Sequence, residues 1–222
     1  MNRDLFVLGL AAGAGMYILF RKPVTVDSST GETDDAPSLI DEIVVSGEPN
    51  VNTPDDVIAQ QRAAFLKLIQ TTEGTAATTQ PYLTLFNYDK SFPANYEDHP
   101  ANQGWSGVPL SDDMCKNAGL NPPCHSSAAG AYQITKPTWN RLAQKLGLTS
   151  FAPDQQDLAA LELIREKGAL SLIDENDIGG AVSKVAQIWA SLPGNTAGQN
   201  PKTVQYVLDT YQNLLTQIQQ EA

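Results

Sequence analysis

Between Gly130 and the end of the chain, apolar residues recur at helical spacing in four successive segments, and this periodicity limits the possible folds more than any other feature. Each segment starts at a proline or an aspartate, and the first and third end at Gly147 and at Pro193–Gly194. We therefore expect four helices that form a mainly helical lobe. Their expected starts are Pro137, Pro153–Asp154, Asp177 and Asn200–Pro201.

The sequence ahead of this lobe carries one helix signal and one strand signal. Thr53 followed by Pro54 and two aspartates is typical of a helix start, and apolar residues at helical spacing continue as far as Gly74. The aromatic, alternating stretch YLTLFNY (Tyr82–Tyr88) predicts a strand. A small β lobe inserted between an N-terminal helix and a mainly helical lobe is an α+β fold.

An apolar run precedes this body. Residues 5–20 are uncharged and are flanked by Arg3 and by Arg21–Lys22. We expect residues 1–22 to be a membrane anchor or signal-anchor with a single transmembrane-type helix, although a comfortable helical span takes about 20 apolar residues. A signal peptide cleaved at Ala12–Ala14 is the alternative.

An acidic segment joins this run to the body. Residues 23–55 are polar and contain Pro, Gly, Ser and Thr, which predicts a flexible tether, and residues 56–222 form the folded domain. The net charge is -11, and nine acidic residues without one basic residue lie between Asp27 and Gln60. From Gln61 onward there are 15 acidic and 11 basic residues, a net of -4. This acidic balance excludes a general affinity for nucleic acid.

The two cysteines, Cys115 and Cys124, lie nine positions apart in a loop rich in Pro, Asn and Gly. If the body lies outside the cytoplasm, a disulfide that closes this loop is the natural interpretation. Two free thiols are the alternative. A zinc site that adds His99 and His125 has suitable ligand types, but its spacing matches no familiar zinc pattern.

Glu73 is the residue in this sequence best placed for acid chemistry. It lies in IQTTEGT, at the C-terminal edge of the first expected helix, where the carbonyl groups create a negative potential. Together with partial burial, that potential would raise the pKa of the Glu73 carboxyl. A carboxyl that is protonated near neutral pH can donate its proton to a leaving oxygen. A solvated surface glutamate before a glycine cap is the alternative.

Three stretches resemble the phage-lambda type endolysin family, whose members are lysozyme-fold lytic transglycosylases that act on bacterial peptidoglycan. They are AFLKLIQTTEGT (Ala64–Thr75), the segment Ser126–Leu170 with its GAYQ strip, and IWASLPG (Ile188–Gly194). The resemblance covers about residues 60 to 215 and implies a lysozyme-like fold. It also implies that Glu73 is the catalytic acid and that Tyr132 and Gln133 line the glycan cleft. The anchor and the tether have no counterpart in it.

The acids near Glu73 bear on the reaction type. Glycosidases that use two carboxylates need a second acid beside the scissile bond, and the ninth position after Glu73 holds Tyr82. A lone carboxyl can instead protonate the leaving oxygen and then deprotonate the 6-hydroxyl of muramic acid, which attacks the anomeric carbon and yields a 1,6-anhydro end. Asp89, Glu97 or Asp98 could still fold back into the cleft, so hydrolysis remains the alternative.

Other residues have weaker signals. The amide of Gln133 suits sugar hydroxyls or N-acetyl groups, and Tyr132 offers an aromatic face with a hydroxyl, although both suit ordinary strand packing as well. Ser127 and Thr75 are further candidates for binding the glycan or holding Glu73. The strip GAYQITKPTWNRL (Gly130–Leu142) contains no phosphate-binding glycine loop and no metal ligands, so we expect no cofactor and no metal.

The expected function is therefore cleavage of the MurNAc-GlcNAc β-1,4 bond in peptidoglycan glycan strands. We expect a virion-associated enzyme that acts during cell entry, anchored through residues 5–20 in the virion or the host inner membrane, with its body facing the periplasm or cell wall. A signal-anchor endolysin for host lysis and an inactive glycan-binding virion protein, with virion proteins as partners, are the alternatives. Arg21–Lys22 favours the opposite anchor orientation and leaves that point open.

Overall fold

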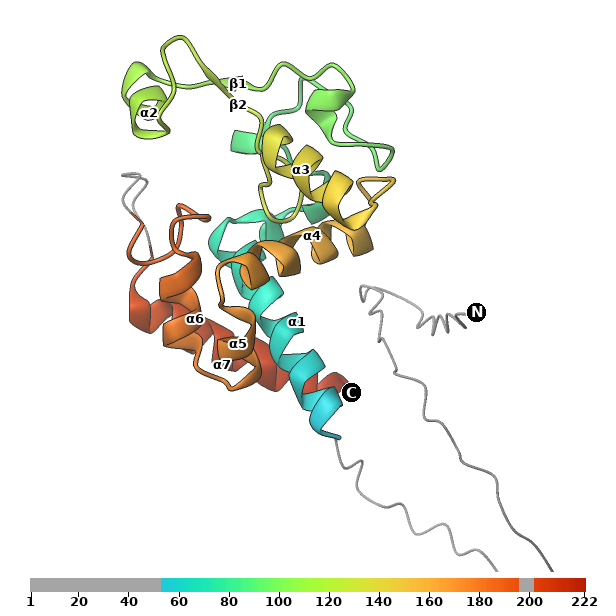
Figure 1. The fold of residues 1–222 in the computed structure, drawn as a ribbon, viewed down its shortest axis with the longest axis vertical. Helices are drawn as coiled ribbons and strands as arrows, with labels where there is room; N and C mark the ends of the chain where they lie inside the picture. The colour runs from blue at the N-terminus through green and yellow to red at the C-terminus, as the bar shows by residue number, and fades with distance from the viewer. Residues whose placement is uncertain (1–52, 196–201) are drawn as a thin grey trace, which may run out of the picture. The chain divides into compact units, whose positions relative to one another are not determined.

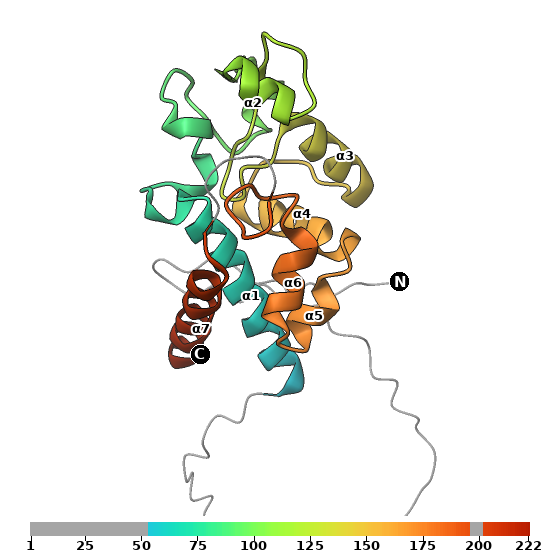
Figure 2. The same ribbon diagram turned by 90° about the vertical axis from the view of Figure 1, so that its left-hand side faces the viewer.

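Helix α1 (Pro54–Thr72) is the central helix of the helical lobe (Figure 1). It packs against helices α4 (Pro153–Glu166), α5 (Leu170–Asp174) and α7 (Val204–Glu221). The computed structural model describes residues 53–195 and 202–222. Side chains all round α1 are buried, including Phe65, Leu68 and Ile69, because helices cover it on more than one side. In Figure 2, α7 lies along one side of α1, while α5 and α6 (Ile178–Val185) lie on the other.

In the helical lobe, the observed helix starts agree closely with the expected ones. The first two expected helices are confirmed, and the third begins where Asp177 accepts a hydrogen bond from the Gly180 N–H. This third helix ends earlier than expected, because turns replace the helix before Pro193. A short fifth helix was not predicted. The bounds are α3 (Lys136–Leu146), α4 (Pro153–Glu166), α5 (Leu170–Asp174) and α6 (Ile178–Val185).

The strand predicted at Tyr82–Tyr88 is wrong. Two 3-10 turns, η2 (Pro81–Leu83) and η3 (Phe86–Tyr88), occupy this stretch, and only Leu85 makes a bridge, to Ala129. Positive φ angles of 55° at both residues that follow Phe86 rule out an extended strand, because the left-handed region turns the chain. The lobe retains a small sheet elsewhere in the sequence.

That sheet consists of two short antiparallel strands, β1 (Val108–Pro109) and β2 (His125–Ser126). Between them, helix α2 (Asp112–Asn117) carries a fully buried Cys115, which forms a disulfide with Cys124, with the two Cα atoms 5.8 Å apart. The disulfide interpretation is confirmed. It excludes the zinc alternative, because the two sulfur atoms are bonded to each other.

His99 is a structural residue of the core. Its ring is fully buried against Phe151, its Nε2 lies 3.0 Å from the carbonyl oxygen of Ile134, and its Nδ1 accepts a hydrogen bond from the Ala101 N–H. Burial lowers the pKa of His99, so the neutral ring is favoured. Both ring nitrogens thus hold backbone groups together near the strip Gly130–Ile134.

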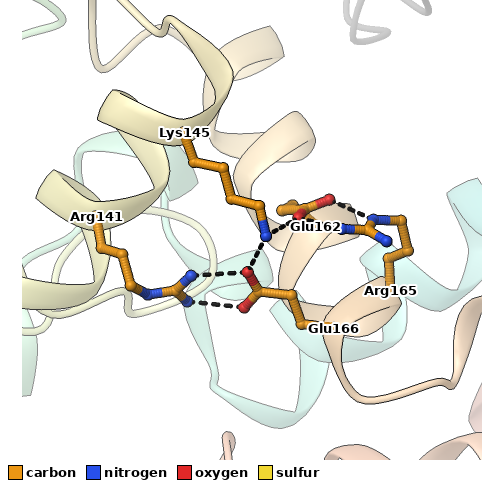
Figure 3. Close-up of polar contacts among 5 residues, drawn as sticks. All are labelled: Arg141, Lys145, Glu162, Arg165 and Glu166. Atoms are coloured by element: carbon orange, nitrogen blue, oxygen red, sulfur yellow. Dashed lines mark hydrogen bonds and ion pairs between the residues drawn. The ribbon is translucent and has the colours of Figure 1, made fainter.

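An ion-pair network holds α3 against α4 (Figure 3). Arg141 Nη1 and Nη2 make a forked contact with the Glu166 carboxylate at 2.7 and 2.8 Å. Lys145 lies between Glu162 and Glu166, at 2.7 and 2.6 Å. Arg165 makes a second forked contact with Glu162, so each carboxylate is shared between two cations. The network orients the two helices, and water at this surface limits its contribution to stability.

Several expectations concern residues outside the described part of the chain. The anchor predicted at 1–22, the tether predicted at 23–55 (apart from its last three residues) and the helix start expected at Asn200–Pro201 belong to them. Among residues 53–195 and 202–222, no helix has both the length and the apolar character needed to cross a membrane.

Candidate active site

A cavity of about 210 Å³ lies where α1 ends, beside the turns η2 and η3 and the segment that follows α6. Within the described residues, Glu73 is the only carboxylate that lines it. Polar groups, two aromatic rings and one leucine form the rest of the wall. The lining residues are Thr72, Glu73, Thr75, Thr84, Leu85, Phe86, Asn87, Tyr88, Gln133 and Ser191.

Glu73 directly follows the last residue of α1. Its N–H still bonds to the carbonyl oxygen of Ile69 at 2.9 Å, whereas Gly74 leaves the helix with a φ of 80°. Burial raises the pKa of the Glu73 carboxyl, and the hydroxyl of Ser191, which donates a 2.7 Å hydrogen bond to Oε1, opposes this effect. The expectation of a raised pKa is confirmed, with burial as the main cause.

Ser191 is a site residue that sequence reasoning missed. It lies in the WASLPG motif, which supports the family resemblance but shows no catalytic pattern of its own. Trp189 Nε1 donates a 2.9 Å hydrogen bond to the carbonyl oxygen of Tyr132, and the carbonyl oxygen of Ser191 accepts from the Lys202 N–H at 2.8 Å. These two contacts fix the turn, so the Ser191 hydroxyl is aimed at Glu73.

Gln133 lines the cavity, as predicted. Its Nε2 donates to the carbonyl oxygens of Thr84 and Gly130 at 3.1 and 3.0 Å, which fixes the plane of the amide. Its φ is 48°, an uncommon left-handed value for a residue other than glycine. The backbone is therefore held in a strained conformation that turns this side chain toward the cavity.

Tyr132 does not line the cavity, so its predicted place in the cleft is wrong. The side chain is 1% exposed and lies in the core. Its hydroxyl donates to Asp157 Oδ1 at 2.6 Å and accepts from Gln70 Nε2 at 3.1 Å. Tyr132 and Gln133 point in different directions, one to the core and the other to the cavity, so Tyr132 supports the site from behind.

Asp157 is a second residue that sequence reasoning missed. Its Oδ1 also accepts a hydrogen bond from the hydroxyl of Tyr82, at 2.9 Å. Burial raises the pKa of Asp157 to about 6, and the two tyrosine hydroxyls oppose that rise. On its sequence alone, Asp157 resembles a surface residue near the start of α4, because its partners come from distant segments.

Thr75 and Ser127 have structural roles in this structure. Thr75 lines the cavity, but its buried hydroxyl lies 2.6 Å from the carbonyl oxygen of Ala131 and fastens the turn after Glu73. Ser127 is absent from the cavity wall, and its Oγ accepts from the N–H of Lys136 at the start of α3. The expectation that Ser127 lines the glycan site is therefore not met.

The acids considered as a second carboxylate do not line this cavity. Asp89 Oδ2 accepts a hydrogen bond from Trp105 Nε1 at 2.8 Å, and Asp98 Oδ1 accepts one from Trp139 Nε1 at 3.1 Å. Both carboxylates hold the loop before α3 in place. Glu73 stands without a carboxylate partner on the described cavity wall.

Comparison with known proteins places these features in a family. A sequence profile described as Endolysin matches residues 63–218. The endolysin of Escherichia phage lambda is 37% identical over 146 residues, which is 64% of this chain and 83% of the relative. The endolysin of Escherichia phage P2 is 31% identical over 172 residues, which is 73% of this chain and 94% of the relative.

Solved structures show the same fold. The lysozyme of bacteriophage lambda complexed with a chitohexasaccharide superposes with a TM-score of 0.57 at 32% identity, over 70% of this chain and 94% of that one. A second structure of lysozyme from bacteriophage lambda gives a TM-score of 0.51 at 30% identity, over 72% and 93% of the two chains. The expected lysozyme-like fold is confirmed.

Proposed function

This chain belongs to the endolysin family, and from that premise we propose that it is a peptidoglycan lytic transglycosylase. The proposed reaction cleaves the MurNAc-GlcNAc β-1,4 bond and leaves a 1,6-anhydro-MurNAc end. One observation carries the choice of reaction: Glu73, with a pKa raised by burial, is the only carboxylate on the described cavity wall. Two-carboxylate hydrolysis requires a second acid across the scissile bond.

The substrate class is supported by a relative. The lambda lysozyme was solved with a chitohexasaccharide, a β-1,4-linked chain of N-acetylglucosamine units. Peptidoglycan glycan strands have the same linkage and the same N-acetyl groups. We therefore assign glycan strands as the substrate of this chain, with the scissile bond placed at Glu73.

Glu73 acts twice in the proposed reaction. In the protonated form, which burial favours, it donates its proton to the leaving glycosidic oxygen. As a carboxylate it then removes the proton of the muramic-acid 6-hydroxyl, and that oxygen forms the new bond to the anomeric carbon. The hydrogen bond from Ser191 stabilises the carboxylate form that the second step needs.

The remaining cavity residues have positioning roles in this proposal. The fixed amide of Gln133 presents its oxygen as an acceptor for a sugar hydroxyl or an N-acetyl N–H. Thr75 holds the turn that carries Glu73 at the Ala131 carbonyl. Both residues keep the geometry in place before the substrate arrives, which lowers the entropic part of the barrier.

For the cellular role, we propose a membrane-anchored enzyme that is associated with the virion and opens the wall during entry. The apolar run 5–20 and the acidic segment 23–55 support this role, because a long tether lets an anchored domain search the wall. A signal-anchor endolysin for host lysis is the second candidate, supported by the same run. Fractionation of purified virions, followed by detection of this chain, separates the two.

The reaction is tested with Glu73→Gln and purified peptidoglycan. The amide keeps the shape of the side chain but cannot donate a proton as the acid does. We expect release of soluble muropeptides to stop while binding to glycan strands remains. Continued release by the variant would contradict the assignment, and loss of binding in a folded variant would mean that Glu73 acts in recognition only.

A further inference from the structure

Tyr88 combines high exposure with a position on the wall around Glu73. Its side chain is 53% exposed, and among the large apolar or aromatic residues that are exposed in the described parts of the chain, Tyr88 alone lines this cavity. Single exposed aromatic side chains are common on protein surfaces, so the informative feature of Tyr88 is its position on the cavity wall beside Glu73. The exposed ring is therefore placed to contact a ligand that binds beside the Glu73 carboxyl.

The backbone at Tyr88 is strained, and contacts of the following residue hold the turn in place. Asn87 and Tyr88 both have a φ of 55°, in the left-handed region that is unfavourable for a bulky residue. The next residue, Asp89, anchors the turn through Trp105 Nε1, at 2.8 Å, and through Ser91. Strain that the surrounding contacts maintain is concentrated at functional sites.

The ring of Tyr88 lies against the residue that follows Glu73. A methyl group placed on Gly74 would lie 2.5 Å from the Tyr88 hydroxyl oxygen, so a larger residue at position 74 would displace the Tyr88 side chain from this position. Gly74 also has a φ of 80°, which a glycine adopts without strain. Gly74 thus permits both the turn after Glu73 and the close approach of the ring to it.

We propose that Tyr88 is a sugar-binding residue that stacks its ring on the N-acetylhexosamine unit next to the scissile bond. A β-1,4-linked pyranose exposes C–H groups on its faces and hydroxyls at its edge. An aromatic ring with one polar end matches that distribution, since it covers the apolar face and leaves the hydroxyl free for the edge. Phe86, on the same wall, extends the apolar surface.

This assignment rests on the proposed function, because it takes the glycan strand as the ligand of the cavity. It adds a specificity element to a site in which Glu73 carries out the proton transfers and Ser191 donates a hydrogen bond to its carboxylate. A ring that stacks on a sugar contributes to affinity through its aromatic surface and not through its hydroxyl. Removal of the ring and removal of the hydroxyl therefore have different predicted effects.

The test measures binding of chitohexaose by calorimetry in the Glu73→Gln background, which removes turnover. We expect Tyr88→Ala to weaken binding by about tenfold, the loss typical of a central aromatic contact, and Tyr88→Phe to stay close to the parent. Tyr88→Asn is the second variant, because asparagine tolerates the left-handed backbone and has no ring. It should lose as much affinity as Tyr88→Ala. Tyr96→Ala, an exposed tyrosine away from the cavity, is the matched control.

Unchanged affinity in both ring-deleting variants would overturn the stacking proposal, and so would an equal loss in Tyr88→Phe. This outcome is separable from a failure of the proposed function. If Tyr88 is not a stacking residue, the unsubstituted chain still releases muropeptides and Glu73→Gln still does not. If the proposed function is wrong, either the unsubstituted chain releases no muropeptides or Glu73→Gln still releases them, whatever the Tyr88 variants do.

Discussion

Ser191 donates a 2.7 Å hydrogen bond to the carboxylate of Glu73, although 118 positions separate the two residues in the sequence. The contact joins the end of α1 to the turn that follows α6. It acts on the same carboxyl as burial does, but in the opposite direction, since a donated hydrogen bond favours the ionised form. The acid is thereby balanced between the protonated form needed first and the carboxylate needed second.

Replacement of Ser191 by alanine is expected to shift the pH profile of cleavage. Without the donated hydrogen bond, burial acts unopposed and the pKa of Glu73 rises further. Activity is lost as the pH rises through that pKa, because the acid must be protonated for the first step. The basic limb of kcat/KM should therefore move to higher pH. Ser183→Ala, at an exposed position on α6, serves as the control and should leave the limb in place; a shift to lower pH in Ser191→Ala would refute this role.

Asp157 makes stability depend on pH in a direction that can be calculated. Burial raises its pKa from 3.8 to about 6. The folded protein therefore holds this proton more tightly than the unfolded chain, and the stabilisation is complete below about pH 4 and is lost as the pH rises through about 6. Relative to Asp157→Asn, the unfolding free energy of the unsubstituted chain should fall by up to about 3 kcal/mol across this window.

Urea unfolding at a series of pH values measures this difference. Asp154→Asn, one helical turn earlier on α4, retains Asp157 and should show the same decline with a smaller amplitude, because the Asp154 charge contributes to the raised pKa of Asp157. Parallel pH curves for the unsubstituted chain and Asp157→Asn would contradict the inferred burial of an ionisable carboxyl. The groups that face Asp157 are Tyr82, Tyr132, Asp154 and Lys67, and none of them is changed in Asp157→Asn.

Thr75→Val tests whether the hydrogen bond from the Thr75 hydroxyl stabilises the turn after Glu73. Valine keeps the volume of the side chain but leaves the carbonyl oxygen of Ala131 without its 2.6 Å hydrogen bond in a buried environment. An unpaired buried polar group costs about 1–3 kcal/mol, so the unfolding free energy should fall by that amount. Thr79→Val, at an exposed position in the next turn, should change it by less than about 0.5 kcal/mol. An equal effect of the two substitutions would refute the role of Thr75.

The helices were predictable because their ends carry local chemistry. Proline at the start of α3 and α4, Asp177 as the cap of α6 and Gly147 after α3 all act through the adjacent backbone. The prediction of a strand at Tyr82–Tyr88 was wrong because distant contacts, and not local chemistry, determine the structure there. Its alternating aromatic residues fit a strand, but contacts with distant residues hold this stretch in left-handed and 3-10 turns.

The same distinction, between local signals and contacts with distant residues, explains which site residues could be predicted from the sequence. Glu73 is marked locally by its position at a helix end, whereas the place of Gln133 in the cleft is implied by the family resemblance. Ser191 and Asp157 were missed because their importance comes from partners more than 70 positions away, Glu73 and Tyr82 respectively. Tyr132 was misplaced because a neighbouring pair of residues in a tight turn need not face the same way. Its ring faces the core while Gln133 faces the cavity.

The chemical nature of the released glycan ends tests the central claim most directly. Peptidoglycan is digested in water labelled with a heavy oxygen isotope, and the muropeptides are analysed by mass spectrometry. Intramolecular attack of the 6-hydroxyl, with Glu73 as the lone acid, predicts 1,6-anhydro ends. These ends are lighter by one water than the reducing ends that hydrolysis leaves, and they carry no label. Reducing ends that contain the labelled oxygen would show that water attacked the anomeric carbon, and would contradict the transglycosylase mechanism.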